Sequence, residues 1–112
     1  MTQFDLYMAN LPYHEDSHIL RGPHPVVVVS NDVANAHSPL ITVVPLTSQL
    51  RRFDLPTHIL LCGQGLRRDS MAMCEQMMPL DSSRCIFQIG HIDRFDDQAA
   101  LIHGIEAHLG LA

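Results

Sequence analysis

The fold is decided by the stretch GPHPVVVVSND at residues 22–32. Its four consecutive valines are β-branched and form a run too short to cross a membrane, so they predict a buried β-strand. Pro25 fixes its own φ and holds His24 in an extended conformation just before that strand. The polar residues 30–32 favour a turn after the strand, because their side chains bond the nearby backbone.

A second stretch, ITVVPLTSQ at residues 41–49, repeats this pattern. It predicts another buried strand, which ends in the hydroxyls of Thr47 and Ser48 and the amide of Gln49. Because strands that are neighbours in sequence usually pair, we expect His24 and Thr47 on the same small sheet. An imidazole and a hydroxyl on a rigid sheet can serve nucleophilic or acid–base chemistry. The functional site is therefore expected where these two strands meet.

Length and charge limit the class of protein. A chain of 112 residues is expected to form a single domain, 1–112, with its own core. Its net charge of −5 argues against a generally basic nucleic-acid binder, so any such contact must be local. All seven basic residues are arginine, and five of them lie between Arg21 and Arg68. This bias favours a phosphate-bearing ligand, with solvated surface arginines as an equal alternative.

Cysteine usage and the chain's hydropathy indicate the compartment. Cys62, Cys74 and Cys85 are odd in number and lack CxxC spacing, which fits reduced thiols better than a disulfide framework. The first residues lack the basic-then-apolar pattern of a signal peptide, and no segment reaches transmembrane length. We therefore expect a cytoplasmic protein that does not engage a membrane.

Residues 14–18, HEDSH, match the HExxH signature of zinc proteases. That chemistry needs both imidazoles on one face of a helix, with the glutamate beside a metal-bound water. Pro12 precedes the motif, Gly22 and Pro23 follow it, and its flanks lack apolar periodicity. A polar surface loop is the preferred interpretation.

The rest of the chain reads mainly as strands, followed by one helix. The other expected strands are 4–11, 57–61, 70–76 and 85–92, and residues 79–84 are expected to form a turn or a short helical passage. Asp93 is the expected N-cap of a C-terminal helix that Gly110 ends. The helix is expected to pack on the sheet through a stripe of Phe95, Ala99, Ile102, Ile105 and Leu109. This order predicts a mostly β fold: a small, bent, largely antiparallel barrel with a C-terminal amphipathic helix.

Segments spread over nearly the whole chain resemble the MazF/PemK family of toxins. Residues 22–32 resemble its GxRPVVVVSND segment, PLTSQ at 45–49 looks like its P[IL]TS[QK] strand end, and 55–58 resemble its LPTH segment. Residues 65–76 are similar to its GLxxDS…xEQ stretch, and the LGL at 109–111 also fits. The segments occur in the family's order, which is much more specific than any one of them.

The resemblance implies an SH3-like barrel with a C-terminal helix, usually assembled as a homodimer. It implies the toxin of a type II toxin–antitoxin system, an endoribonuclease that cleaves single-stranded RNA at specific sequences. No metal and no cofactor are implied. The expected protein partner is a cognate MazE-like antitoxin that covers the RNA groove.

Cleavage by an internal 2′-OH needs a base, an acid and hydrogen-bond donors that face the phosphorane. Thr47 matches the family's hydroxyl and is expected to bond a non-bridging phosphate oxygen. The family's arginine is replaced by His24, which can exchange protons but lacks a permanent charge and a bidentate fork. Arg21 or His18 is expected to supply part of what is missing. A second departure places Ile19 where the family has a glutamate.

The expected RNA-binding residues are His18, Ser48, Gln49, Arg51, Arg52, Glu75 and Gln76. Arg51 and Arg52 are candidate phosphate contacts, or else a solvated pair. Gln76 is a candidate reader of a base edge, or else a cap on a strand end.

Three functions remain open at this point. The first is an RNase whose pH profile is set by His24. The second is a weakened toxin that retains antitoxin binding. The third is suggested by the CcdB-type toxins, which share the barrel but bind DNA gyrase, mainly through the C-terminal helix, without chemistry of their own.

Overall fold

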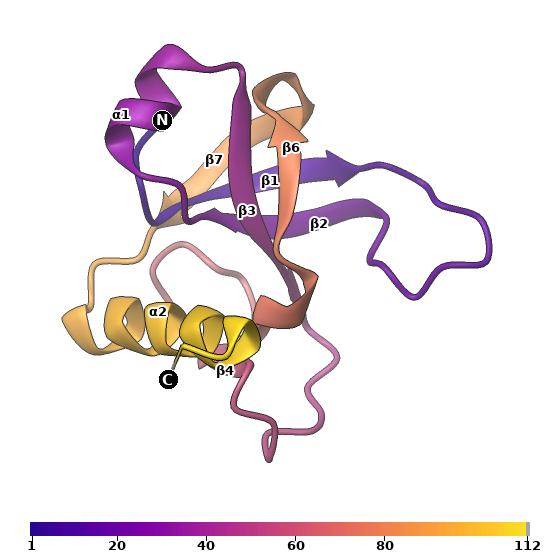
Figure 1. Cartoon of the computed structure of the whole chain (residues 1–112), viewed down its shortest axis with the longest axis vertical. Coiled ribbons are helices and arrows are strands. Elements are labelled where there is room, and N and C mark those ends of the chain that lie inside the picture. The colour runs from indigo at the N-terminus through magenta and orange to yellow at the C-terminus, as the bar shows by residue number, and fades with distance from the viewer. Residues whose placement is uncertain (112) are drawn as a thin grey trace.

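The computed structural model describes residues 1–111, and within them the chain forms a sheet, two α-helices and two 3-10 turns (Figure 1). The elements in chain order are β1 (Asp5–Leu11), β2 (Gly22–Val28), α1 (Asp32–His37), β3 (Leu40–Thr47), β4 (His58–Leu61), β5 (Ser70–Met73), η1 (Cys74–Gln76), β6 (Met78–Asp81), η2 (Ser82–Arg84), β7 (Cys85–His91) and α2 (Phe95–Leu109).

The strands pair antiparallel in the order β4-β5-β3-β2-β1-β7, and β6 pairs with β3 beside this path. The predicted mostly β fold with a C-terminal helix is confirmed. The barrel is not complete, because this strand pairing does not close on itself. No helix within residues 1–111 is long and apolar enough to span a membrane.

The four valines are buried because both faces of β2 are covered. Val26 and Val28 belong to one apolar cluster with Ile41, whereas Val27 and Val29 belong to another with Leu101 of α2. A strand that is buried on both faces has a continuous apolar run in place of an alternating one. The predicted strand is thus confirmed, and it forms the centre of the core together with β3. It begins earlier than predicted, at Gly22, so His24 lies within the strand and not just before it.

Three local predictions need correction. Residues 30–32 lead into helix α1, because the Asn31 side chain accepts a hydrogen bond from Ala34 N at 2.8 Å and caps it. Residues 79–81, expected as part of a turn, belong to β6 (Met78–Asp81), which pairs with β3, whereas the helical turn that follows at 82–84 was expected. The predicted strand 70–76 ends at Met73, and Cys74–Gln76 form a 3-10 turn.

Helix α2 ends at Gly110 as predicted, in a left-handed conformation with φ 75°. Its N-cap is Arg94, one residue after the expected Asp93. The predicted packing stripe is mostly wrong: Ile105 does pack against the core, but Phe95 is 78% exposed, and the buried residues of the helix are Leu101 and Gly104. The helix packs through the face that carries Gly104 because this residue has no side chain. A Cβ at position 104 would lie only 2.8 Å from Cys74 Sγ, so a larger residue there would not fit.

The start of β1 is held by a buried carboxylate. Asp5 Oδ2 accepts a hydrogen bond from Thr2 N at 2.7 Å, and Oδ1 lies 2.8 Å from His91 Nδ1 on β7. Partial burial acts to raise the pKa of Asp5, but hydrogen bonds from Thr2 and His91 outweigh it and lower the pKa overall. The carboxylate therefore stabilises the fold above its ordinary pKa, and this contribution is lost as the pH falls through the lower folded value.

We expect Asp5→Asn to lower the free energy of unfolding at pH 7 by about 1–3 kcal/mol, because an amide cannot accept both bonds. The difference from the parent protein should narrow at acid pH, as the pH falls through the lowered pKa of Asp5 and its carboxylate becomes protonated. Urea unfolding at pH 7 and pH 3 measures the free energies of unfolding of the parent protein and the variant, and so the difference between them. Asp93→Asn removes the same charge from an exposed position and is the control; equal effects of the two changes would contradict the prediction.

Candidate functional site

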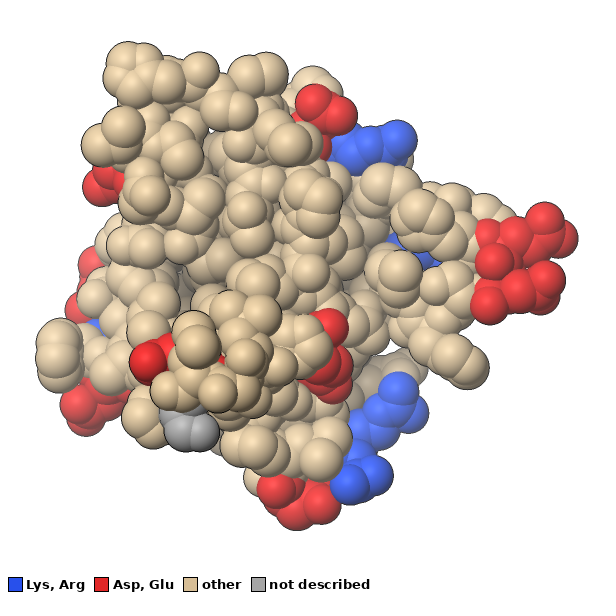
Figure 2. Space-filling view, in the orientation of Figure 1, with Lys and Arg blue, Asp and Glu red and all other residues tan. Residues whose placement is uncertain are grey.

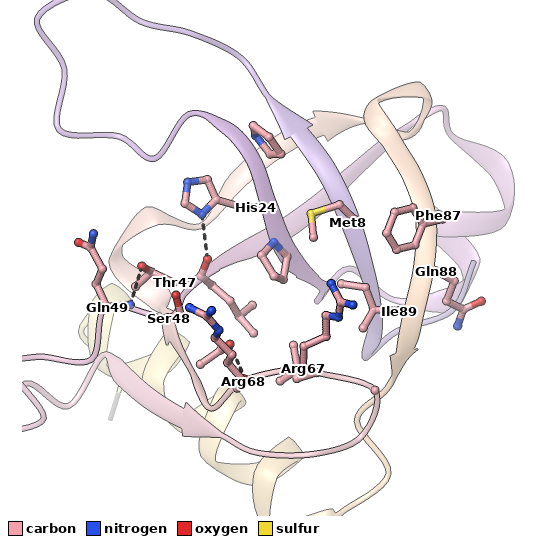
Figure 3. A pocket seen from close by; sticks show the side chains of 16 residues that line it. Met8, His24, Thr47, Ser48, Gln49, Arg67, Arg68, Phe87, Gln88 and Ile89 are labelled. Carbon is pink, nitrogen blue, oxygen red and sulfur yellow. Dashed lines mark hydrogen bonds between the residues drawn. The ribbon is translucent and has the colours of Figure 1, made fainter.

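A cleft of about 870 Å³ opens where β1, β2, β3 and β7 meet the loops that follow β3 and precede β5 (Figure 3). No Asp or Glu lines it among the residues that the structure describes, although the chain as a whole carries a net charge of −5. The lining residues are Met8, Pro23, His24, Pro25, Leu46, Thr47, Ser48, Gln49, Gly65, Leu66, Arg67, Arg68, Ser70, Phe87, Gln88 and Ile89.

His24 is held at this cleft by the hydrogen-bond ladder of the sheet. Val29 N donates to Thr42 O across β2 and β3, and such bonded pairs recur every second residue in an antiparallel ladder. Two residues along, the next such pair is Val27 with Val44, and the one after it is Pro25 with Leu46. Proline has no N–H, so Pro25 cannot donate a hydrogen bond to Leu46. His24 Nδ1 lies 3.2 Å from Leu46 O and supplies the missing hydrogen bond.

This bond fixes the tautomer of His24. A carbonyl oxygen only accepts, so Nδ1 must carry the proton and donate it. In the neutral ring Nε2 then has a free lone pair. His24 is thereby arranged to accept a proton at Nε2.

Thr47 ends β3 and is 9% exposed. The β2–β3 register pairs Val26 with Pro45, and continuing it by two residues places His24 opposite Thr47. The expected position of both residues on one sheet is thus confirmed. Thr47 Oγ1 accepts a hydrogen bond from Gln49 N at 3.1 Å, which leaves the hydroxyl proton to be donated elsewhere. Ser48 and Gln49 also line the cleft.

Arg67 and Arg68 bring positive charge to the same cleft, and both are exposed. Neither has a carboxylate within 4 Å among the described residues. The sequence interpretation did not select them as site residues. The excess of arginine in the first two thirds of the chain was the signal that could have identified them.

The loop that carries these arginines is fixed by two glycines. A Cβ at Gly65 would lie 2.4 Å from Ile89 O, and a Cβ at Gly90 would lie 2.0 Å from Gln64 O. Only glycines permit so close an approach of the loop backbone to β7. Gln64 adds hydrogen bonds to the start of α2, through Asp93 N at 2.9 Å and Asp97 Oδ2 at 2.9 Å.

Three predicted residues stabilise the loop between β1 and β2 and do not line the cleft. The Arg21 guanidinium lies 4.7 Å from the centre of the Tyr13 ring. Gln76 accepts a hydrogen bond from Leu20 N at 2.8 Å and donates one to the carbonyl oxygen of His18 at 3.3 Å. The Gln76 amide is therefore engaged on both sides by this loop.

Arg51, Arg52 and Glu75 also lie outside the cleft lining. On the face shown in Figure 2, basic side chains gather on the loop between β3 and β4, which carries both arginines. Arg52 is paired with Asp54 at 3.0 Å, and both side chains are exposed. Glu75 Oε2 lies 2.6 Å from His58 Nε2. Partial burial acts to raise the pKa of Glu75, but the hydrogen bond and charge of His58, together with hydrogen bonds from the Glu75 backbone and Thr57, outweigh burial and lower the pKa overall.

The described residues do not provide the site of a zinc protease. Residues 14–18 form a loop with a turn, so the two imidazoles are not presented on a helix, as the preferred interpretation expected. Within residues 1–111 no group of three or more His, Cys, Asp or Glu side chains is placed to hold a metal ion.

Cys74 is not suited to act as a nucleophile. Burial raises the pKa of its thiol to about 12, so the thiol stays neutral.

Comparison with known proteins gives a consistent result. The family described as "PemK-like, MazF-like toxin of type II toxin-antitoxin system" matches residues 2–102. The chain is 35% identical over 91 residues to Endoribonuclease EndoA of Bacillus subtilis, which covers 80% of this chain and 78% of that protein.

Solved structures share the fold. MazF from Deinococcus radiodurans superimposes with a TM-score of 0.83 at 22% identity, covering 98% of this chain and 96% of that one. An endoribonuclease from a mycobacterial species, solved in complex with its cognate antitoxin, gives a TM-score of 0.82 at 19% identity and covers 100% and 97%.

Proposed function

Because this chain belongs to the PemK-like, MazF-like toxins of type II toxin–antitoxin systems, we propose that it is an endoribonuclease that cleaves single-stranded mRNA at specific sequences without a metal ion. The observation that carries the proposal is the cleft, which combines an imidazole and a hydroxyl with two arginines and, among the residues that the structure describes, no carboxylate. A polyanion is favoured in such a cleft even though the protein is acidic overall. The relative from Bacillus subtilis carries the name of the same activity.

In the proposed reaction the 2′-OH attacks the adjacent phosphorus. The 2′-oxygen loses its proton to His24 Nε2 as the new O2′–P bond forms, and the P–O5′ bond breaks. The departing O5′ takes up a proton from solvent water, so the products are a 2′,3′-cyclic phosphate and a 5′-OH end. The Thr47 hydroxyl donates to a non-bridging oxygen, and Arg67 and Arg68 offset the charge of the phosphorane. Arg67 and Arg68 thereby supply the positive charge that the family's arginine would provide at the position of His24.

The same proposal includes the partners. We infer that a cognate MazE-like antitoxin occupies the cleft and blocks RNA, as the mycobacterial neighbour was solved with its antitoxin. A homodimer is the proposed assembly, and the cytoplasm, where mRNA is translated, is the proposed place of action. His18, Arg21, Arg51, Arg52, Glu75 and Gln76 remain proposed RNA contacts, which would act from loops beside the cleft.

The test is cleavage of a long single-stranded RNA in EDTA from pH 5 to pH 8, with detection of new 5′-OH ends. We expect the parent protein to cleave, with a rate that rises as a single imidazole-like group loses its proton. In His24→Ala the rise of the cleavage rate with pH should disappear, because no base remains at that position. An unchanged profile would assign the base to His18 or another group. No cleavage at any pH would overturn the enzymatic proposal and favour a protein that only binds its antitoxin.

A further inference from the structure

We propose that Phe87 forms a stacking surface for one unpaired base of the RNA, next to Arg67. This inference rests on the proposed function, since it assigns a base-binding subsite in the same cleft. In Figure 3 the Phe87 ring lies across the cleft from Thr47, with Met8 and Arg67 between the two walls. The ring belongs to β7 and is not part of any sequence motif discussed above.

Phe87 is an exposed aromatic residue in the wall of the cleft. It is 56% exposed and lines the cleft. The register of β1 and β7 pairs it with Met8, and Ile89 follows two residues later on the same wall. An aromatic ring left open to solvent beside other apolar side chains is a surface for a flat apolar group.

The positive charges near Phe87 favour a nucleotide over an uncharged flat ligand. In Figure 3 Arg67 lies beside Ile89 on the same side of the cleft as Phe87, and Arg68 lies nearer Thr47. A nucleotide presents a flat base together with an anionic phosphate, so an aromatic ring beside a guanidinium matches both parts. Bases stack on aromatic side chains with little regard to sequence, because every base has a π-face. The absence of carboxylates from the described cleft lining removes the repulsion that a phosphate would meet.

Binding is tested without cleavage, so that the two proposals can fail separately. The probes are fluorescein-labelled 12-mers of uridine and of adenosine with 2′-O-methyl groups, which cannot attack the phosphorus. Fluorescence anisotropy gives the dissociation constants of the parent protein, Phe87→Ala, Phe87→Tyr and Ile86→Ala. Ile86 is the matched control, because it adjoins Phe87 on β7 and is 61% exposed but does not line the cleft.

We expect Phe87→Ala to raise the dissociation constant by about 5- to 150-fold, the range for loss of one base–aromatic stack. Phe87→Tyr should stay within about twofold of the parent because the ring is retained, and Ile86→Ala should be unchanged. Single abasic positions in the 12-mers provide a second test. One abasic position should weaken binding to the parent protein but not to Phe87→Ala, as expected for two changes that remove the same contact.

Three results would overturn the inference. In the first, Phe87→Ala binds the 12-mers like the parent protein. In the second, Ile86→Ala weakens binding as much as Phe87→Ala, which would indicate a general effect on β7. In the third, sedimentation shows that Phe87→Ala dissociates a dimer, which would assign the ring to a contact with a second copy.

Discussion

Replacing Thr47 by valine is expected to reduce RNA cleavage by about 10²- to 10³-fold, the usual effect of removing one preorganised donor to a developing charge. Valine keeps the shape of threonine and removes only its hydroxyl. The side chain is 9% exposed at the end of β3, so the change leaves a well-packed position filled. Single-turnover cleavage of a long single-stranded RNA, with the RNA in limiting amount, measures the loss directly.

Two further variants make this result specific. Thr47→Ser retains a hydroxyl and should recover most of the lost rate. Thr42→Val makes the same chemical change elsewhere on β3, away from the cleft lining, and should cleave normally. A Thr47→Val protein with full cleavage activity would contradict the assignment. A toxin of the gyrase-binding class would remain toxic in Thr47→Val, because its action does not depend on this hydroxyl.

The second large effect is on stability: Gly90→Ala is expected to lower the free energy of unfolding by about 3 kcal/mol. This is at the upper end for overpacking. The added Cβ would lie 2.0 Å from Gln64 O, and a backbone carbonyl cannot rotate aside as a side chain can. The loop that precedes β5 must therefore move away from β7, and it carries Arg67 and Arg68 with it. RNA affinity should also depend less steeply on salt, because fewer phosphates are contacted.

Gly22→Ala is the matched control for Gly90→Ala. Gly22 has φ 75° but nothing within 4 Å of an added Cβ, so its substitution costs only the strain of a left-handed conformation, about 1–2 kcal/mol. Urea unfolding at pH 7 compares the two variants. If Gly22→Ala were the more destabilised, close packing against Gln64 would not be what fixes the loop.

The parts of the fold that the sequence predicted are those with strong local signals. The valine run of β2 and the glycine that ends α2 were identified because β-branching and a left-handed C-cap act within a few residues. Strand β6 was missed because Met78–Asp81 contain a proline and have little β-propensity of their own. It is a strand because it pairs with β3, with Pro79 opposite Thr42. The face of α2 was missed because Gly104, the smallest residue, makes the close approach.

The candidate site was predictable to a similar extent. His24 and Thr47 could be brought together because they lie on neighbouring stretches that were predicted as strands, and adjacent strands usually pair. Arg67 and Phe87 could not be predicted to share the cleft, because they are brought together by the contact between Gly65 and Ile89 of β7, which are 24 residues apart in sequence. The spacing of residues in the sequence does not reveal a contact between segments so far apart. Arg21 and Gln76 were selected from the motif, but their side chains contact the loop between β1 and β2.

The hydrogen bond between His24 and Leu46 has a consequence for the speed of the proposed reaction. A side chain that must find one rotamer as substrate binds loses conformational entropy at that moment, and the barrier rises accordingly. Here the imidazole is oriented when the sheet folds, because it replaces the donor that Pro25 lacks. The search for a productive orientation of this base is thus completed during folding, and each RNA molecule meets a group that is already aligned.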